Sequence, residues 1–216
     1  RKPQRCSKCQ SVAYCSRGCQ INAWKGYHKR ECACMRALRQ LKRVAPVDIL
    51  VISRAALSFS ASKSKGGVPP DRVPLGEKLS DFLCLNTLWE KRSDEEKINY
   101  AKRATMTMNY LKPLLPESGD PAEIGFPPMK LLAEWYSLLE SNAYWVCDEE
   151  SRPIGLGIYP VAAMVNHSCT PNAVALFTNT EICLRSTIPL KDGEEVKVSY
   201  VDLCETKKRR RAELSK

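Results

Sequence analysis

The pattern of apolar and polar residues divides the chain into a helical stretch followed by a strand-rich stretch. Between about residue 79 and Asn142, apolar residues recur every three or four positions, which is the spacing of one face of an α-helix. Acidic residues 94–96 open the second stripe, where negative charge favours the helix dipole. We interpret the stripes as a helical core rather than a cofactor site. The three stripes are Leu79, Phe82, Leu83 and Trp89; Ile98, Ala101, Thr105, Met108 and Leu111; and Leu131, Leu132, Trp135, Leu138 and Leu139.

After Asn142 the helical period gives way to brief β-branched or aromatic runs separated by Gly, Pro, Asn and Asp, which predicts short strands. Residues 192–193, Asp-Gly, predict a tight turn before the last strand. Residues 55–74 are rich in Ser, Lys, Gly and Pro, and predict an exposed loop. The expected fold class is therefore α+β. The predicted strands are 143–146, 158–159, 173–177, 182–186 and 195–201, and further helices are expected at 29–42 and 205–216.

Length and hydropathy narrow the class of protein. The 216 residues can bury one core and a small satellite module. No run of 18 apolar residues occurs, so we expect no membrane span. The first five residues are polar and basic, so no signal peptide is visible, and the missing initiator Met suggests a fragment.

The net charge of +10 is unevenly distributed. Residues 1–43 carry 12 Lys and Arg against one acid, Glu31, whereas residues 44–204 carry 16 against 21 and residues 205–216 carry six against two. A basic N-terminal module favours acidic peptides or nucleic acid as partners. An acidic middle suits a Lys-rich substrate.

Six of the eleven cysteines and one of the two histidines lie in the first 34 residues. Zinc takes four Cys or His ligands, which two short-spaced pairs can supply, and this favours a reducing compartment over disulfides. Six candidates fill one site and half of another. They are Cys6, Cys9, Cys15, Cys19, His28 and Cys32. The remaining scattered cysteines are interpreted as small buried apolar residues: Cys84, Cys147, Cys169, Cys183 and Cys204.

The spacing of these ligands resembles the MYND zinc finger, including Tyr14, Trp24 and the ending at residues 28–32, His-Lys-Arg-Glu-Cys. The interleaved ligation of that family implies one zinc ion held by Cys6, Cys9, His28 and Cys32. In so small a module the bound metal supplies the folding energy. The resemblance also implies a surface for a partner, which basic residues would form: Lys2, Arg5, Lys8, Arg17, Lys25, Lys29 and Arg30.

The same resemblance implies a second zinc ion on Cys15 and Cys19, together with an earlier Cys-x2-Cys pair that this chain lacks. We expect either truncation or an empty, partly frayed first site. Cys34 is an alternative ligand, although it follows Cys32 by only two residues in the same expected helix.

The strand-rich stretch carries short motifs in a fixed order. Tyr200 follows His167 by 33 positions, and the whole order resembles that of the SET- and MYND-domain lysine methyltransferases, the SMYD family, from about residue 6 to the end. The motifs are residues 142–147 (NAYWVC), 155–160 (GLGIYP), 165–169 (VNHSC), 184–185 (LR), 193–195 (GEE) and Tyr200.

This resemblance implies S-adenosylmethionine as cofactor and a lysine side chain as methyl acceptor. It implies that Asn142, Asn166 and His167 bind the cofactor, that Asn86 adds a contact, that Tyr200 orients the amine at the methyl-transfer pore and also contacts the cofactor, and that Tyr144 lines the lysine channel. Each residue alone also has a structural interpretation, such as a loop for Asn166 and His167, a helix C-cap for Asn142 and a core or rim position for Tyr200.

The predicted organisation is a zinc finger (1–43), a helical insert (44–140), the second half of a SET domain (141–204) and a charged terminal helix (205–216). The predicted function is protein-lysine N-methylation on a histone or another protein. The alternatives are a noncatalytic zinc-dependent adaptor and a nucleic-acid-binding regulator acting through residues 1–43. We expect a monomer, located in cytoplasm and nucleus, with a peptide or DNA contact at the finger. Basic residues 207–211 fit either a nuclear-import signal or a solvated helix face.

Two departures from the family pattern concern this chain. In the SMYD family the first SET strands, with a Gly-rich cofactor segment, precede the finger, and a Cys-rich post-SET segment follows the terminal helix. Neither occurs in this sequence. The expectation is a fragment whose cofactor pocket lacks two walls and whose own activity, target lysine and degree of methylation stay open.

Overall fold

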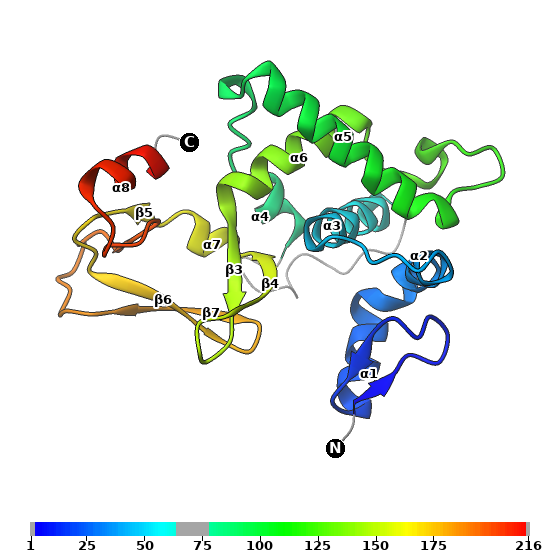
Figure 1. Ribbon diagram of the computed structural model, residues 1–216, viewed down its shortest axis with the longest axis horizontal. Helices are drawn as coiled ribbons and strands as arrows, with labels where there is room; N and C mark the ends of the chain where they lie inside the picture. The colour runs from blue at the N-terminus through cyan, green and yellow to red at the C-terminus, as the bar shows by residue number, and fades with distance from the viewer. Residues whose placement is uncertain (1–2, 64–77, 215–216) are drawn as a thin grey trace. The chain divides into compact units, whose positions relative to one another are not determined.

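The computed structural model describes residues 3–63 and 78–214, which fall into two compact units. The first unit contains residues 1–73 and 86–141, and the second contains residues 74–85 and 142–216. Helices and short strands are mixed, which confirms the predicted α+β class (Figure 1). No helix within the described ranges is long and apolar enough to cross a bilayer.

The first unit begins with a small module that has almost no apolar core. Strands β1 (Gln4–Arg5) and β2 (Ala13–Tyr14) form an antiparallel hairpin, and α1 (Arg17–Ala23) follows with Ser16 as its N-cap. A single π-helical turn, Trp24–His28, leads into α2 (Lys29–Gln40). The sequence predicted the second helix within two residues of its observed end.

Helices α3 (Val47–Lys63), α5 (Asp94–Leu111) and α6 (Met129–Asn142) form the core of the first unit. The hydroxyl groups of Thr107 on α5 and Tyr136 on α6 lie 2.6 Å apart in the interior. Ser93 caps α5 and forms a capping box with Glu96, which explains why the helix begins there. The third helical stripe of the sequence is confirmed. A helix also lies where the second stripe predicted one, but the stripe is not its core face, because Ile98, Ala101 and Thr105 are exposed. The buried residues of α5 are Tyr100, Ala104, Thr107, Tyr110 and Leu111. The largest fully buried apolar side chains here are Ile52, Leu111, Leu132, Trp135 and Leu138.

Helix α3 corrects the expected loop at residues 55–74. The helix continues to Lys63 because Ile52, Ala56 and Leu57 are buried along one face, and Phe59 makes an edge-to-face contact with Trp135 at a centroid distance of 5.8 Å. Serine-rich composition therefore indicated a loop where tertiary packing favours a helix. Residues 64–74 of the expected loop lie outside the described residues.

The first predicted helical stripe is also corrected. Helix α4 ends early, at Leu79–Leu83, and Trp89 belongs to a separate 3₁₀ turn, Trp89–Lys91. Leu88 between them has a left-handed backbone with φ of 51°, which ends any continuous helix. Further 3₁₀ turns lie at Lys112–Leu114 and Pro121–Ile124.

The second unit consists of short strand pairs. Strand β3 (Ala143–Cys147) pairs antiparallel with β4 (Pro153–Ile158), and β6 (Ala173–Thr178) pairs antiparallel with β7 (Glu181–Ser186). Strand β5 (Asn166–His167) pairs parallel with β8 (Lys197–Val198). Helix α7 (Pro160–Ala163) precedes β5, and α8 (Lys207–Leu214) closes the unit.

The predicted strands differ from the observed ones mainly at their ends. The fourth observed strand ends at Ile158 instead of beginning there, and the last covers only Lys197–Val198 of the expected 195–201. The predicted tight turn is present, because Gly193 has φ of 78° and the Glu194 N–H donates to the Lys191 carbonyl.

Tyr159 joins the two hairpins of the second unit. Its ring lies 6.1 Å from that of Tyr144 and 5.8 Å from that of Phe177, and its hydroxyl donates to the Thr180 carbonyl at 2.8 Å. A Cβ atom at Gly157 would lie 2.9 Å from the Tyr159 ring, so only glycine leaves room for the ring there.

Candidate metal centre and methyl-transfer site

Four residues of the N-terminal module bring their ligand atoms to one point. The sulfur atoms of Cys6, Cys9 and Cys32 and a ring nitrogen of His28 all lie within 4.8 Å of one another, and all four residues are buried. Cys6 Sγ is 3.9 Å from Cys32 Sγ, and Cys9 Sγ is 3.5 Å from His28 Nε2. A zinc ion about 2.3 Å from each sulfur needs edges of roughly 3.8 Å, so this metal cluster fits zinc.

Local structure explains the positions of these ligands. Cys6 and Cys9 lie on a tight turn after β1, where the Gln10 N–H donates to the Cys6 carbonyl and Gln10 has φ of 58°. The π-helical turn ends at His28, and Cys32 follows one helical turn later on α2. His28 Nδ1 is buried and has no hydrogen bond within the described chain, although Glu31 Oε1 lies 3.6 Å away.

The thiol groups of the metal cluster have shifted pKa values. Burial raises the pKa of Cys6, but hydrogen bonds from the Cys9 backbone and the His28 side chain outweigh it and lower that pKa to about 6. Burial, and then the charge of Cys9, raise the pKa of Cys32 to about 12. Because the thiols must ionise to bind a metal, a divalent cation is needed to offset their combined charge.

The other three cysteines of the module lie outside the metal cluster. Cys15 and Cys19 are exposed, with their sulfur atoms 3.3 Å apart, and within the described residues no third ligand group joins them. Their role as ligands of a second zinc ion stays a prediction. Cys34 is fully buried in α2, and burial raises its pKa to about 12, which indicates a core thiol rather than a ligand.

The second unit brings together residues that are distant in the sequence. Parallel pairing of β5 with β8 sets His167 opposite Val198, and the Tyr200 N–H then donates to His167 Nδ1 at 3.0 Å. The two rings lie 5.4 Å apart between centroids. The Tyr200 hydroxyl donates a short hydrogen bond to the Val165 carbonyl, and the residue is 54% exposed.

Asn166 lies beside these rings and faces an acidic side chain. Its amide nitrogen donates to Glu195 Oε1 at 2.6 Å, and Lys197 Nζ lies 3.1 Å from the other carboxylate oxygen. The Asn166 amide, followed by Lys197, lowers the pKa of Glu195. Asn166 is exposed, so its side chain is within reach of a ligand.

Tyr144 completes a group that we call the tyrosine site, made of Tyr144, Asn166, His167 and Tyr200. The Tyr144 hydroxyl donates to the Ala162 carbonyl at 2.9 Å. Burial raises the pKa of Tyr144, and the charge of Tyr200 is the second cause, so the two phenols are close enough to interact. Asn142, two residues before Tyr144, is the last residue of α6.

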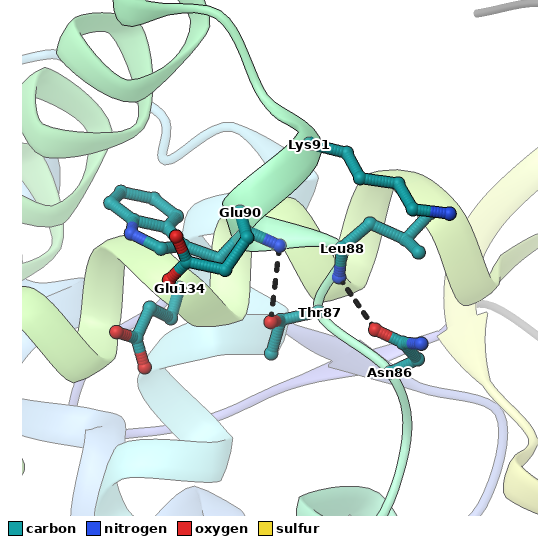
Figure 2. A pocket seen from close by; sticks show the side chains of 7 residues that line it. Asn86, Thr87, Leu88, Glu90, Lys91 and Glu134 are labelled. Carbon is teal, nitrogen blue, oxygen red and sulfur yellow. Dashed lines mark hydrogen bonds between the residues drawn. The ribbon is translucent and has the colours of Figure 1, made fainter.

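Asn86, the remaining predicted cofactor contact, belongs to the first unit. Its Oδ1 accepts from the Leu88 N–H at 2.8 Å, and Figure 2 shows this bond at the edge of a pocket of about 350 Å³. Its cofactor role stays a prediction. The pocket is lined by Asn86, Thr87, Leu88, Trp89, Glu90, Lys91 and Glu134.

Asn172 supports the tyrosine site and was given no role from the sequence. It is 8% exposed; its Oδ1 accepts from the Lys197 N–H at 2.7 Å, and its amide donates to the Glu195 carbonyl at 2.9 Å. It therefore holds β8 and the residues before it in place. An Asn directly after Pro171 was the available signal, but only the packing distinguishes it from an ordinary turn residue.

Comparison with known proteins agrees with this arrangement. The MYND finger family matches residues 1–32, and the SET domain family matches residues 62–201. Human histone-lysine N-methyltransferase SMYD3 is 30% identical over 99% of this chain and 46% of its own length. Arabidopsis thaliana histone-lysine N-methyltransferase ASHR1 is 29% identical over 92% of this chain and 38% of its own. Human N-lysine methyltransferase SMYD2 is 28% identical over 92% of this chain and 42% of its own length.

The chain thus spans less than half the length of these curated relatives. The two family matches lie in the order that the residue motifs predicted, finger first and SET domain second. The SET match covers well over half of the chain. This chain belongs to the SET- and MYND-domain (SMYD) family of protein-lysine methyltransferases.

Proposed function

We propose that this chain carries part of the active site of a protein-lysine N-methyltransferase that uses S-adenosylmethionine. The observation that carries the proposal is the pairing of β5 with β8, which places Asn166 and His167 beside Tyr200. The cofactor supplies a sulfonium methyl group. The neutral lysine amine forms the new carbon–nitrogen bond as the carbon–sulfur bond breaks.

Tyr200 has the properties of an orienting group. Burial raises its pKa above the ordinary value of 10, so the phenol stays protonated at neutral pH. A protonated phenol donates a hydrogen bond, as it does here to the Val165 carbonyl, and it cannot remove a proton. We therefore assign Tyr200 to aligning the lysine amine and not to general-base catalysis.

His167 and Asn166 are assigned to cofactor binding. The backbone of Tyr200 fixes the orientation of the His167 ring through Nδ1, and Nε2 lies 3.4 Å from Cys169 Sγ. The exposed Asn166 amide offers both a donor and an acceptor, which suits a ligand that carries both. Asn142, at the end of α6, and Asn86 are proposed as further contacts.

Tyr144 is assigned to the lysine channel. Its ring packs edge-to-face against Tyr159, and its hydroxyl is held by the Ala162 carbonyl, so its apolar face has a fixed direction. A rigid aromatic wall removes water from a lysine side chain, and desolvation favours the neutral amine that methyl transfer needs.

The test combines cofactor binding by calorimetry with transfer of labelled methyl groups to a lysine-rich histone substrate, using the native protein. Tyr200→Phe removes only the hydroxyl group, and we expect transfer to fall about 100-fold while cofactor affinity changes little. Tyr100→Phe, which removes a hydroxyl bound to Glu140 in the first unit, should leave transfer intact. A native protein that neither binds the cofactor nor transfers methyl groups would refute the proposal.

We further propose that the substrate is a lysine-rich segment of a histone or another protein. The curated relatives are named histone-lysine or N-lysine methyltransferases. Residues 44–204 of this chain carry 21 acidic against 16 basic side chains, which favours a positively charged substrate. Raising the salt concentration should therefore increase KM for a lysine-rich peptide more than for a neutral peptide that carries one lysine.

For the basic N-terminal module we propose an acidic peptide as partner. Lys8 lies over the Trp24 ring at 5.5 Å, so charge and an aromatic surface occur together. We propose that the protein is a monomer. Fluorescence titration with an acidic peptide should show that it binds this peptide. Preferential binding of a DNA duplex, with affinity falling steeply with salt, would favour nucleic acid instead.

A further inference from the structure

A carboxylate is completely buried next to the metal cluster. Glu31 is 0% exposed and lies on α2, one residue before the ligand Cys32. Its two oxygen atoms accept hydrogen bonds from Arg54 Nε and Nη2 of α3, both at 2.9 Å. A buried carboxylate is costly unless it is paired, and this forked contact pairs both oxygens. Arg54 remains 39% exposed, so Glu31 is the buried member of the pair.

The same carboxylate faces a ligand of the metal cluster. Glu31 Oε1 lies 3.6 Å from His28 Nδ1, a buried nitrogen with no hydrogen bond among the described residues. The opposite ring nitrogen, Nε2, is directed to Cys9 Sγ in the metal cluster. A histidine that binds a metal through Nε2 carries its proton on Nδ1, and that proton needs an acceptor.

We infer that Glu31 is a positioning residue that orients His28 toward the metal and, through Arg54, couples metal occupancy to helix α3. The inference concerns the N-terminal module and does not depend on methyl transfer. Among the described residues near His28, Glu31 is the acidic group within ion-pair distance of Nδ1. Carboxylate–histidine–metal contacts fix the ring and raise the basicity of the ligand.

Two further contacts tie the same surfaces together. The Arg54 guanidinium lies 4.1 Å from the centroid of the Tyr27 ring, and Arg30 Nη1 donates to the Leu57 carbonyl of α3 at 2.9 Å. Tyr27 belongs to the π-helical turn that ends at His28. A change in the orientation of His28 would therefore reach α3 at Arg54 and, about one helical turn later, at Leu57.

The chain offers a matched control on the same helix. Asp48, near the start of α3, accepts from Arg103 of α5, with Nε at 2.9 Å from Oδ2. Its side chain is 11% exposed and that of Arg103 is 47% exposed, close to the values for Glu31 and Arg54. Neither Asp48 nor Arg103 is a ligand of the metal cluster. If the pair of Glu31 with Arg54 had only a structural role, removing one charge from either ion pair would have the same effect.

The first measurement is zinc affinity, obtained by competition with a chromophoric chelator on the full 216-residue chain. Glu31→Gln keeps the shape of the side chain and removes its charge, and we expect affinity to fall about 10- to 100-fold. Asp48→Asn should leave zinc affinity unchanged even if it lowers the melting temperature. Parental affinity in Glu31→Gln, or an equal loss in Asp48→Asn, would overturn the inference.

A double variant separates positioning from folding. Glu31→Leu combined with Arg54→Met replaces the ion pair by apolar side chains, a change that often preserves stability. We expect a zinc-saturated chain that melts near the parent while its zinc affinity remains lowered. Recovery of parental zinc affinity in this variant would show that Glu31 acts only through the ion pair, which contradicts the inference.

Hydrogen exchange tests the coupling to α3. Removing zinc from the parent should speed exchange of the amides around Arg54. In the double variant zinc removal should speed those amides less, because the contacts of Arg54 are gone and only others, such as that of Arg30 with the Leu57 carbonyl, remain. The amides around Asp48 serve as an internal reference on the same helix. Equal responses of the α3 amides in the parent and the double variant would refute the coupling.

Discussion

The metal cluster and the tyrosine site are assembled in opposite ways. The four residues of the metal cluster lie within 27 positions of one another and are almost fully buried, with His28 1% exposed. The tyrosine site joins residues up to 56 positions apart, and Tyr200 is 54% exposed. The first depends on short-range spacing and a bound ion, whereas the second depends on strand pairing at a surface. A change at the metal cluster and a change at the tyrosine site should therefore affect different parts of the chain.

Removing the metal should have the largest effect. Chelation, or Cys9→Ser, should abolish the hydrogen-exchange protection of residues 3–40, because structural zinc contributes on the order of 10 kcal/mol in such modules. The second unit should keep its protection. The prediction that the scattered cysteines are buried is wrong, because Cys84, Cys169, Cys183 and Cys204 are exposed and Cys147 is half-buried. Cys183→Ser, on β7, is therefore the control and should change neither region. A finger that stays protected without metal would contradict the assignment of the cluster.

The buried Asn172 should be the most sensitive position of the tyrosine site. Asn172→Ala leaves the Lys197 N–H and the Glu195 carbonyl without their partner, and we expect a loss of about 3 kcal/mol in urea unfolding. Exchange should rise around β8 and leave the metal cluster unaffected. The exposed Asn99 of α5 provides the control, Asn99→Ala, and an equal loss there would contradict the packing argument.

A smaller effect is expected at the contact between the two hairpins. Gly157→Ala places a Cβ atom 2.9 Å from the Tyr159 ring, which must shift, and we expect a loss of about 1–2 kcal/mol. Gly155→Ala, on the same strand, meets Val146 Cβ at an ordinary 4.0 Å and should be tolerated. The stability of both variants is measured by thermal unfolding. Equal stability of the Gly157 and Gly155 variants would contradict the role of Tyr159 in joining the two hairpins.

The smallest effect concerns acid stability at the surface. The pKa of Glu195 lies below its ordinary value of 4.5, with the Asn166 amide as the main cause, so the folded state favours the charged form. This contribution is present above pH 4.5 and is lost as the pH falls through the folded pKa. Glu195→Gln should therefore lose slightly less stability than the parent between pH 7 and pH 3. Glu117→Gln, at another exposed glutamate, should follow the parent.

Each half of the metal cluster could be predicted from the sequence because its geometry is local, whereas the sharing of one ion by Cys6, Cys9, His28 and Cys32 was implied by the resemblance to the MYND finger. Cys-x2-Cys and His-x3-Cys each occupy about one turn of backbone, so spacing alone brings each pair together. The contact of Glu31 with Arg54 could not be predicted. Nothing in the pattern around residue 54 marks an arginine that reaches a buried acid 23 positions earlier.

Errors in the predicted elements arose where tertiary packing overrides local preference. Serines around residues 58–62 indicated a loop, yet burial of Ile52 and Ala56 keeps α3 helical to Lys63. Leu88 carries a backbone conformation that its residue type does not favour, so the helical stripe across it was misleading. The residues of the tyrosine site were named through a family resemblance, because strand pairing over 31 positions leaves no local pattern.

The π-helical turn at Trp24–His28 makes the finger intolerant of changes in length. The Lys29 N–H reaches back five residues to the Trp24 carbonyl, so this turn holds one residue more than an ordinary helix. Deleting one residue would replace this wide turn by an ordinary helical turn and change the direction in which the chain before it enters α2. Cys9 and His28 would then no longer face one point, whatever residues filled the turn. Insertions and deletions should consequently be far rarer than substitutions in this five-residue window of related chains.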